Sequence, residues 1–249
     1  MKYGLCNLSL VAVRQEASDS SEMVTQLLYG DYFKIIEFRK SWVKIRIAFD
    51  QYEGWIDNKQ FKEIDADIYH NLNEKPSKTS SDLMEFVSNE FGQLIAIPIG
   101  SNLQAVPFLN HSHDGNYFEG QLAKENLIQH ALLFLNSPYL WGGKTPFGID
   151  CSGLTQMVYK LNGFFLKRDA KDQATQGETL SFIEESEPGD LAFFDNSEGI
   201  ITHVGIIMAD NYVIHAHGKV RIDMLDHSGI FNIETKRHSH KLRVIKRVL

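Results

Sequence analysis

The chain has 249 residues, enough for one large domain or for two to three small ones, and 43% of them are hydrophobic, as in ordinary globular proteins. Its 25 basic and 32 acidic residues give a formal charge of −7, which argues against a nucleic-acid partner because such partners normally require a basic face. No segment approaches the roughly 18 apolar residues of a membrane span, so we expect no membrane partner either.

Residues 1–65 consist of short β-rich segments. Typical turn sequences separate these segments at Gly30-Asp31, Lys40-Ser41 and Asp50-Gln51. Short strands joined by close turns favour a small β-barrel. The expected strands cover residues 11–13, 25–28, 32–36, 42–47 and 54–56.

Residues 66–120 show a weaker pattern. The stretch 75–82 has the composition of a loop, and the apolar residues within 83–91 recur at the spacing of one helix face. Residues 94–108 then return to a strand-like sequence that is punctuated by proline. We expect a second, smaller β-rich unit in this part of the chain.

The pattern changes again at residue 121, and residues 121–249 indicate a third unit. Apolar residues within 127–135 recur at helical spacing and stop before Ser137-Pro138, and a second helix is expected to start at Cys151 and to end at Gly163. Helices followed by strands favour an α+β domain with an antiparallel sheet. The expected strands cover residues 190–194, 203–208, 212–216 and 242–249.

The sequence places Cys151 directly after a segment rich in glycine and proline, residues 138–150. We expect Asp150 to cap the helix, which puts Cys151 in its first turn. The free amides and partial positive charge of a helix N-terminus favour a thiolate, so the thiol pKa is expected below its usual value of about 8.5. The same amides can bind the oxyanion of a tetrahedral intermediate.

Two histidines can supply the base that a thiol nucleophile needs. His203 opens one expected strand, and His215 lies 12 residues later in the next strand. Asp210-Asn211 between them is typical of a hairpin turn, so adjacent antiparallel strands should bring the two imidazoles together. One of them can then take the thiol proton while the other holds its ring in the required tautomer.

Structural roles and metal binding are the alternatives to this thiol chemistry. A lone cysteine at a helix start or a lone histidine on a strand is more often structural, and Cys6 is expected to be a small apolar residue of a strand. His-x-His pairs on a strand can chelate zinc, but no paired cysteines and no His-Glu-x-x-His motif accompany them, so we expect no metal and no cofactor. These pairs are His111 and His113, His215 and His217, and His238 and His240.

Several motifs in register resemble the NlpC-type cell-wall peptidases. This resemblance implies a papain-like fold in which Cys151 is the nucleophile, His203 the base and His215 the group that orients it. It also implies that the hydroxyl of Tyr139 supports the oxyanion. The motifs are Tyr139-Leu-Trp-Gly-Gly, Asp150-Cys-Ser-Gly, Pro188-Gly-Asp-Leu, His203-Val-Gly-Ile and Ile214-His-Ala.

The N-terminal part is similar to the bacterial Src-homology-three barrels that precede this domain in the γ-D-glutamyl-L-diamino acid endopeptidases. The resemblance implies that Asp169, with Glu16 and Tyr52 of the first barrel, holds the free amine of an N-terminal L-alanine, and that Ser152 lines the same pocket. It also implies one barrel at residues 1–65, a reduced second barrel at 66–120 and the catalytic domain at 121–249. The segments that carry it are Arg14-Gln-Glu16, Gln26–Asp31, Tyr52–Trp55 and Arg168–Gln173.

The implied function is that of a cysteine peptidase acting on peptidoglycan peptides with a free N-terminal L-alanine. It would cut the bond between γ-D-glutamate and the diamino acid, which is lysine or diaminopimelate. A peptide ammonium that leaves water needs carboxylate partners, and a site that demands it rejects substrates lacking it. The alternatives are a papain-like amidase or acyltransferase and a wall-binding module whose catalytic domain is dead, although the intact triad speaks against the latter.

The expected location follows from this substrate. Peptides with a free alanine have already been released from glycan, which fits cytoplasmic recycling. The first 13 residues lack the apolar region and cleavage site of a secretory signal. We therefore expect a cytoplasmic enzyme, or a periplasmic or wall-associated one if a signal has been removed.

Overall fold

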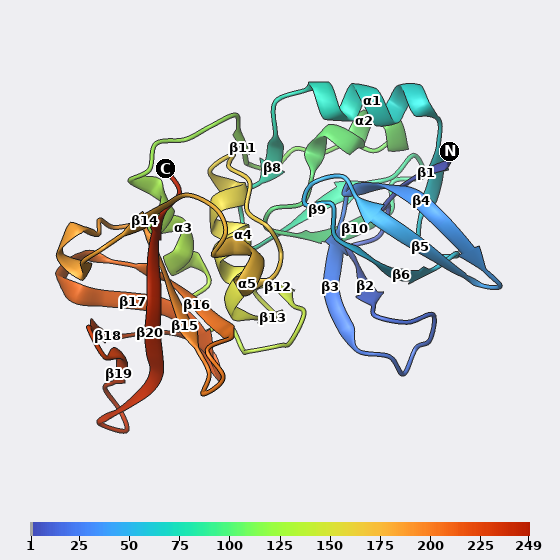
Figure 1. The fold of residues 1–249 in the computed structure, drawn as a ribbon. Helices are drawn as coiled ribbons and strands as arrows, with labels where there is room; N and C mark the ends of the chain where they lie inside the picture. The colour runs from blue at the N-terminus through green and yellow to red at the C-terminus, as the bar shows by residue number, and fades with distance from the viewer. Residues whose placement is uncertain (1) are drawn as a thin grey trace. The chain divides into compact units, whose positions relative to one another are not determined.

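The computed structural model describes residues 2–249 and divides the chain into two compact units, which meet in the sequence between Gln121 and Leu122. The first unit consists mainly of β-structure, and the second combines helices with one large sheet (Figure 1). Within the described residues, no helix is long and apolar enough to cross a membrane.

The first unit contains an antiparallel sheet of seven strands in the order β3-β2-β6-β5-β4-β1-β7, which forms the small barrel. Along β2 and β5 every second residue is buried, as expected for strands with one face on a core. Each fully buried valine or isoleucine contributes roughly 1.5–3 kcal/mol to folding. The strands are β1 (Lys2–Leu5), β2 (Leu10–Arg14), β3 (Met23–Leu28), β4 (Tyr32–Arg39), β5 (Trp42–Ile47), β6 (Glu53–Asp57) and β7 (Lys62–Ile64).

The rest of the first unit forms short elements that share a second apolar core with β1 and the turn after β3. Two small sheets, β9 with β10 and β8 with β11, replace a single continuous one. That this region is a reduced second barrel stays a prediction. The elements are α1 (Ala66–Glu74), β8 (Lys78–Ser80), β9 (Met84–Ser88), β10 (Leu94–Pro98), η1 (Leu103–Ala105), α2 (Val106–Leu109) and β11 (Tyr117–Glu119).

The helix predicted within residues 83–91 is wrong, because β9 and β10 form a hairpin there. Val87 is buried while its neighbour Phe86 is exposed, so burial follows the period of a strand and not that of a helix. The side chain of Asn89 accepts hydrogen bonds from the amides of Phe91 and Gln93, which builds the turn. The strand predicted at 94–108 is likewise correct only as far as Pro98, where β10 ends.

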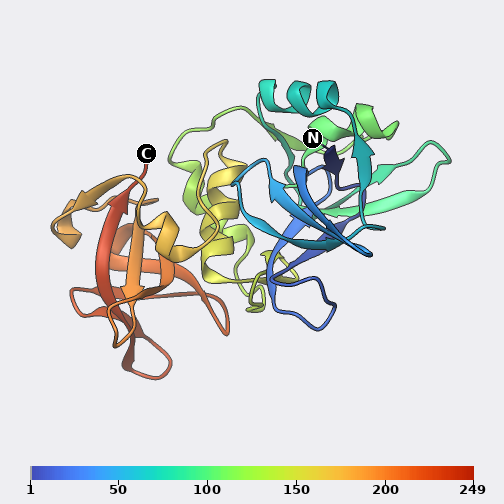
Figure 2. The same cartoon turned by 45° about the vertical axis from the view of Figure 1, so that its right-hand side comes forward.

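The second unit is built from helices that cover a sheet. Helix α4 packs against β16 and β17 and against α3, and all of its residues are buried. Figures 1 and 2 show α3 and α4, in green to yellow, beside the orange and red strands of this unit. The helical and short elements are α3 (Asn126–Leu133), β12 (Lys144–Thr145), β13 (Gly148–Ile149), α4 (Cys151–Leu161), α5 (Ala170–Gln173), η2 (Ile183–Glu185) and η3 (Ala209–Asn211).

The sheet of the second unit is antiparallel, with the order β14-β20-β15-β16-β17-β18-β19. An additional pairing between β19 and β20 closes β15 to β20 into a ring, so the long strand β20 bonds to β19 with its first half and to β15 with its second half. The strands are β14 (Glu178–Leu180), β15 (Leu191–Asp195), β16 (Ile201–Ile207), β17 (Tyr212–His217), β18 (Lys219–Asp226), β19 (Gly229–Asn232) and β20 (Arg237–Arg247).

Candidate active site

Cys151 is the first residue of α4, as the sequence predicts, and its side chain is buried. Asp150 caps the helix: its Oδ1 accepts a hydrogen bond from the amide of Gly153 at 2.6 Å, and its Oδ2 accepts one from the amide of Gly142 at 2.8 Å. Such a cap stabilises a helix by about 1 kcal/mol. It also fixes the turn before the helix, so the position of the thiol is determined by local hydrogen bonds.

A buried ion pair supports this helix start. Arg168 donates to both carboxylate oxygens of Asp150, at 3.0 and 2.7 Å, and to the hydroxyl of Ser152 at 2.9 Å. The Arg168 side chain is only 1% exposed, so the charge of Asp150 is paired away from water. Ser152 thus belongs to the network behind the thiol, and its role in lining the substrate pocket stays a prediction.

The predicted low pKa of the Cys151 thiol is wrong. Burial raises the pKa of Cys151 to about 12, and the negative charge of Asp150 adds to this effect. The backbone amide of Val204 acts on the sulfur in the opposite direction, which places the thiol beside the start of β16. The thiol is therefore protonated at neutral pH, and its proton has to be removed as it attacks.

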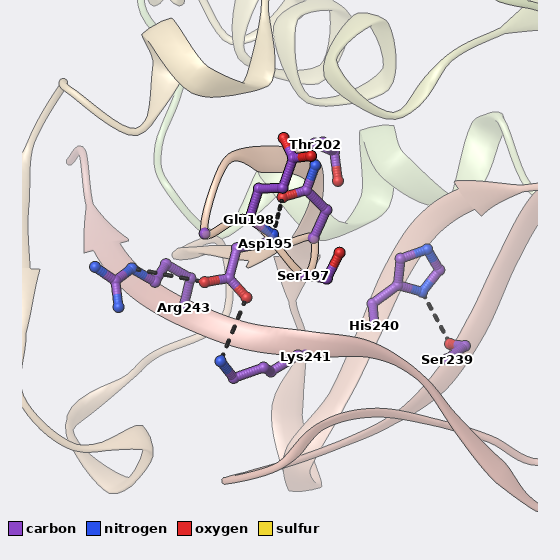
Figure 3. Close-up of a pocket in the computed structure, with 10 residues that line it drawn as sticks. Asp195, Ser197, Glu198, Thr202, Ser239, His240, Lys241 and Arg243 are labelled. Carbon is purple, nitrogen blue, oxygen red and sulfur yellow. Dashed lines mark hydrogen bonds and ion pairs between the residues drawn. The ribbon is translucent and has the colours of Figure 1, made fainter.

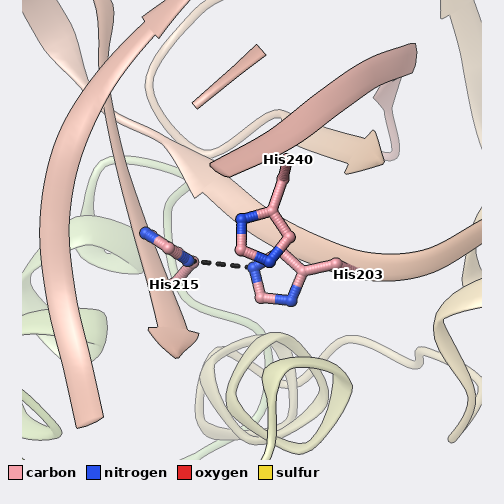
Figure 4. A group of neighbouring side chains, drawn as sticks. All are labelled: His203, His215 and His240. Atoms are coloured by element: carbon pink, nitrogen blue, oxygen red, sulfur yellow. Dashed lines mark hydrogen bonds between the residues drawn. The ribbon is translucent and has the colours of Figure 1, made fainter. Parts of the chain in front are cut away.

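The two histidines lie together, as the hairpin prediction requires. Nε2 of His203 and Nδ1 of His215 are 2.9 Å apart, and both side chains are buried (Figure 4). Asp210 and Asn211 form the turn between β16 and β17, with φ of 57° and 59°. Positive φ at both central residues is the geometry of a tight hairpin.

Gly205 allows the two imidazoles to approach each other. It pairs directly with His215 across the β16–β17 ladder, so it lies on the same face of the sheet as both histidines. A Cβ at this position would lie 3.1 Å from Cβ of His215 and 2.6 Å from Cγ2 of Val213. Only glycine leaves room there without moving one of the strands.

Asp223 on β18 extends this hydrogen-bond chain, and the sequence analysis missed it. Nε2 of His215 lies 3.1 Å from Oδ2 of Asp223, whose side chain is fully buried. Arg221 donates to both oxygens of Asp223, at 2.6 and 3.0 Å. Burial raises the pKa of Asp223, but these hydrogen bonds outweigh it and lower the pKa to about 2, so this group is a carboxylate.

The carboxylate determines where the protons lie along the chain. Because a carboxylate only accepts hydrogen bonds, Nε2 of His215 must be the donor in its bond with Asp223. Burial lowers the pKa of His215, so the ring is neutral and its Nδ1 accepts from Nε2 of His203. Burial and the neighbouring imidazoles also lower the pKa of His203 well below 6.5. Its Nδ1 then carries a free lone pair, which is the state that a general base requires.

Tyr139 lines a cleft of about 210 Å³ together with His203 and His217. Burial, with the nearby acidic groups of Cys151 and Asp150, raises the pKa of Tyr139 to about 12. Its hydroxyl therefore keeps its proton at neutral pH and can donate a hydrogen bond. This is the property that oxyanion support requires.

His240 on β20 completes a cluster of imidazoles around His203 (Figure 4). The rings of His240 and His203 stack with centroids 4.1 Å apart and an angle of 21° between their planes. Nitrogen lone pairs lie in the ring plane, so two stacked, nearly parallel rings do not direct them at one point, as a shared zinc ion would require. The arrangement of this group therefore fits hydrogen bonding between imidazoles better than zinc binding.

The His-x-His pair of the first unit, His111 and His113, has two different hydrogen-bond partners. Nδ1 of His111 lies 2.9 Å from the hydroxyl of Tyr29, and His113 bonds to Glu85. Cys6 is fully buried in the barrel core directly after β1. Burial raises the pKa of Cys6 to about 12, which agrees with the structural role predicted for it.

The residues predicted to hold the substrate amine come from three loops. Glu16 is exposed after β2, and Tyr52 precedes β6. Because Arg14 of β2 pairs with Trp55 of β6, the two loops that carry Glu16 and Tyr52 lie at the same end of these strands. Asp169 occupies the N-cap position of α5, and its side chain makes no capping hydrogen bond there. That these three residues bind an ammonium group stays a prediction.

Two supporting residues could not be found from sequence motifs. Arg168 was part of a matching segment, but nothing in the sequence connects it with Asp150. Asp223 lies in the alternating stretch Lys219–Asp226, which could have been recognised as a further strand next to the one that carries His215.

A cysteine at a helix start, packed against a sheet that carries a His-His-Asp chain, defines a papain-like cysteine hydrolase. The comparisons with known proteins agree: residues 136–238 match the NlpC/P60 family, and residues 13–61 match the bacterial dipeptidyl-peptidase Sh3 domain. The chain is thus a cysteine peptidase that contains an NlpC/P60 domain, with an SH3-like barrel before this catalytic domain.

Curated relatives and a solved structure extend this similarity over most of the chain. The chain is 27% identical to a gamma-D-glutamyl-L-lysine dipeptidyl-peptidase of Bacillus subtilis, over 77% of this chain and 71% of that one. It is 28% identical to dipeptidyl-peptidase 6 of Lysinibacillus sphaericus, over 83% and 85%. An NlpC/P60 family protein from Bacillus cereus has the same fold, with a TM-score of 0.78, 20% identity and 99% of both chains covered.

Proposed function

We propose that this protein is a dipeptidyl-peptidase that releases L-Ala-γ-D-Glu from peptidoglycan peptides by cutting before the diamino acid. The observation that carries the chemistry is the continuous chain from Asp223 through His215 to His203, whose neighbour Val204 contacts the thiol of Cys151 through its backbone amide. The names of the relatives that cover most of the chain support the substrate class.

In the proposed first half-reaction, Nδ1 of His203 takes the proton of Cys151 while Sγ attacks the γ-carbonyl carbon of D-glutamate. The carbonyl electrons move to oxygen, where the hydroxyl of Tyr139 and an amide at the start of α4 donate hydrogen bonds. The C–N bond then breaks, and the departing amine of the diamino acid takes the proton from His203. This leaves the dipeptide as a thioester on Cys151.

In the second half-reaction, His203 removes a proton from water, and the resulting hydroxide attacks the thioester carbonyl. The C–S bond breaks, and the sulfur takes the proton back from His203. Throughout both steps Asp223 keeps the proton of His215 on Nε2, so that Nε2 of His203 remains a donor and its Nδ1 stays the reacting nitrogen.

Specificity in this proposal depends on the amine of the substrate. Asp169 and Glu16 provide two carboxylates, and Tyr52 provides a hydroxyl, for the ammonium of L-alanine. Acetylation removes this charge and leaves the carboxylates unpaired, which costs several kcal/mol. As part of the same proposal, an enzyme with this requirement acts on released peptides in the cytoplasm.

The test is mass spectrometry of L-Ala-γ-D-Glu-L-Lys after incubation with the protein. We expect L-Ala-γ-D-Glu and free lysine, with kcat/KM for the N-acetylated tripeptide lower by orders of magnitude. Cys151→Ala should abolish cleavage, whereas Cys6→Ala, the matched change at the other thiol, should retain it. Equal kcat/KM for the free and acetylated peptides would refute the amine requirement, and a lack of free lysine would refute the peptidase assignment.

A further inference from the structure

A second hollow lies next to the catalytic cleft, between the β15–β16 loop and β20 (Figure 3). It has a volume of about 670 Å³, within the range of small-molecule sites. We name it the β15–β16 pocket, and its charged lining residues are Asp195, Glu198, Lys241 and Arg243. None of the steps proposed above uses these four side chains.

This pocket adjoins the catalytic cleft. Thr202 and His240 line both of them, and the imidazole of His240 stacks directly on that of His203. The departing amine has to receive its proton from His203. The diamino acid that carries this amine must therefore lie on the histidine's side of the scissile bond, where the β15–β16 pocket opens.

Asp195 lines the pocket with a buried carboxylate that lacks a hydrogen bond on one oxygen within the described part of the chain. Its side chain is 2% exposed, and among the described residues its Oδ1 has no hydrogen-bond partner. Lys241 Nζ lies 3.8 Å from Oδ1 and Arg243 Nε lies 3.8 Å from Oδ2, so both cations form ion pairs with Asp195 that are longer than hydrogen bonds (Figure 3). A buried carboxylate oxygen without a hydrogen-bond donor is costly, so it marks a place where a donor is expected to bind.

The strand geometry aims Asp195 into this position. Strand β15 changes register with β16 between Phe194 and Asp195, and with β20 between Phe193 and Phe194. Such bulges at the end of a strand redirect side chains and are frequent beside active sites. Unlike the buried Asp195, the side chains of Lys241 and Arg243 are 75% and 61% exposed, so they can move toward a ligand.

We propose that the β15–β16 pocket is the subsite for the leaving diamino acid, with Asp195 binding its side-chain ammonium and Arg243 its carboxylate. This proposal rests on the proposed function. Lys241 already forms an ion pair with Asp195 that is too long for a hydrogen bond, and the ε-ammonium of a substrate lysine or diaminopimelate is the same chemical group. Arg243 suits the carboxylate because a guanidinium binds carboxylates in a bidentate manner.

The experiment compares two substrates that share the acyl part and differ in the leaving group. One is L-Ala-γ-D-Glu-L-Lys, and the other is the p-nitroanilide of L-Ala-γ-D-Glu, whose leaving group has neither ammonium nor carboxylate. Arg243→Gln and Asp195→Asn should each lower kcat/KM for the tripeptide by about 10-fold or more, the usual effect of losing a hydrogen bond to a charged group. Both variants should hydrolyse the anilide at the wild-type rate.

Removing the substrate group that a residue is proposed to bind should abolish the effect of mutating that residue. Amidating the lysine carboxylate should remove the effect of Arg243→Gln, and replacing lysine by norleucine should remove that of Asp195→Asn. The matched control is Lys246→Gln, which removes a cation of β20 outside the pocket, where it bonds to Thr179, and should leave both substrates unaffected.

The outcomes separate this proposal from the proposed function. A wild-type rate of Arg243→Gln on the tripeptide would overturn the subsite, and so would an equal loss on tripeptide and anilide, because that would indicate damage to the chemistry. Since Arg243 is exposed, this variant should fold even if Asp195→Asn does not. If the wild type cleaves neither substrate, the proposed function fails, and the subsite fails with it.

Discussion

Asp223 does not contact the thiol, yet it determines the protonation of the ring that does the chemistry. Its influence passes through two imidazoles, because each neutral ring that accepts on one nitrogen must donate on the other. A carboxylate can only accept, whereas an amide of the same shape can also donate. The difference between aspartate and asparagine at this position is therefore a difference in the tautomer of His203.

We predict that Asp223→Asn lowers kcat by about 10²–10⁴-fold with little change in KM, which is the size of a general-base contribution. An asparagine amide that donates to Nε2 of His215 reverses both tautomers and moves the proton of His203 to Nδ1. At higher pH a growing fraction of Cys151 ionises without a base, so the kcat of the variant should rise with pH while that of the wild type stays level.

The control for this prediction is Asp226→Asn, three positions further along the same strand. Asp226 also bonds to a histidine, His238, but both side chains are exposed and lie outside the cleft. Stopped assays between pH 6 and 10 can compare the two variants. A uniform loss for Asp223→Asn at every pH would contradict the tautomer argument and would indicate a purely structural role.

At the scale of elements, the start of α4 depends on a buried pair that no local pattern indicates. Asp150 caps the helix, and the chain brings Arg168 back to it after the helix has ended. A buried carboxylate that loses its partner is strongly destabilising. The position of the nucleophile is thus coupled to a residue of the loop before α5.

We predict that Arg168→Met lowers the free energy of unfolding by about 3–5 kcal/mol, because the buried Asp150 loses its charged partner. The double variant Arg168→Met/Asp150→Asn should recover part of this loss, since the uncompensated charge is removed. Urea unfolding of the wild type and the three variants, including Asp150→Asn alone, measures the coupling. Additive losses in the double variant would show that the pair contributes no interaction energy.

The contrast between α4 and β9 shows what could be predicted from the sequence. Asp150, Gly163 and a regular apolar stripe all indicate the same helix, and the structure confirms it. Within residues 83–91 the apolar spacing fits a helix, but Phe86 and Phe91 are exposed, so the apolar spacing was no guide to burial there. Turn chemistry at Asn89 outweighs the pattern.

The same limit applies to the site. Cys151, His203 and His215 stand in recognisable motifs, and the structure brings the two histidines together. The raised thiol pKa of Cys151 could not be predicted, because it results from burial by parts of the chain that are distant in sequence. Asp223 was missed for the related reason that its strand was missed.

For the whole molecule, we expect the pH dependence of the rate to be determined by the enzyme at acid pH and by the substrate at alkaline pH. The lowered pKa of His203 means that the base becomes protonated, and the rate falls, only well below pH 6.5. On the alkaline side the substrate's own amine loses its proton near a pKa of about 8, which removes the charge that Asp169 and Glu16 need.

We therefore predict that kcat/KM is level between these limits and falls above about pH 8, the pKa of a free α-amine, whereas kcat stays level to higher pH. The bound ammonium is held by carboxylates, so its proton is lost later than that of the free peptide. Initial rates on the tripeptide from pH 4 to 10 test this directly. If kcat/KM keeps rising to pH 10, the reacting species is a preformed thiolate and the amine is not required.

The protonated state of the buried nucleophile also bears on oxidative damage. Peroxides and disulfides react with thiolates much faster than with thiols. Burial keeps the pKa of both cysteines, Cys6 and Cys151, near 12, so neither forms much thiolate in the resting enzyme. Oxidation of Cys151 to sulfenic acid should consequently be slow until a substrate binds and the thiol proton moves to His203. The burial that makes a general base necessary for catalysis therefore also protects the enzyme from oxidation when no substrate is bound.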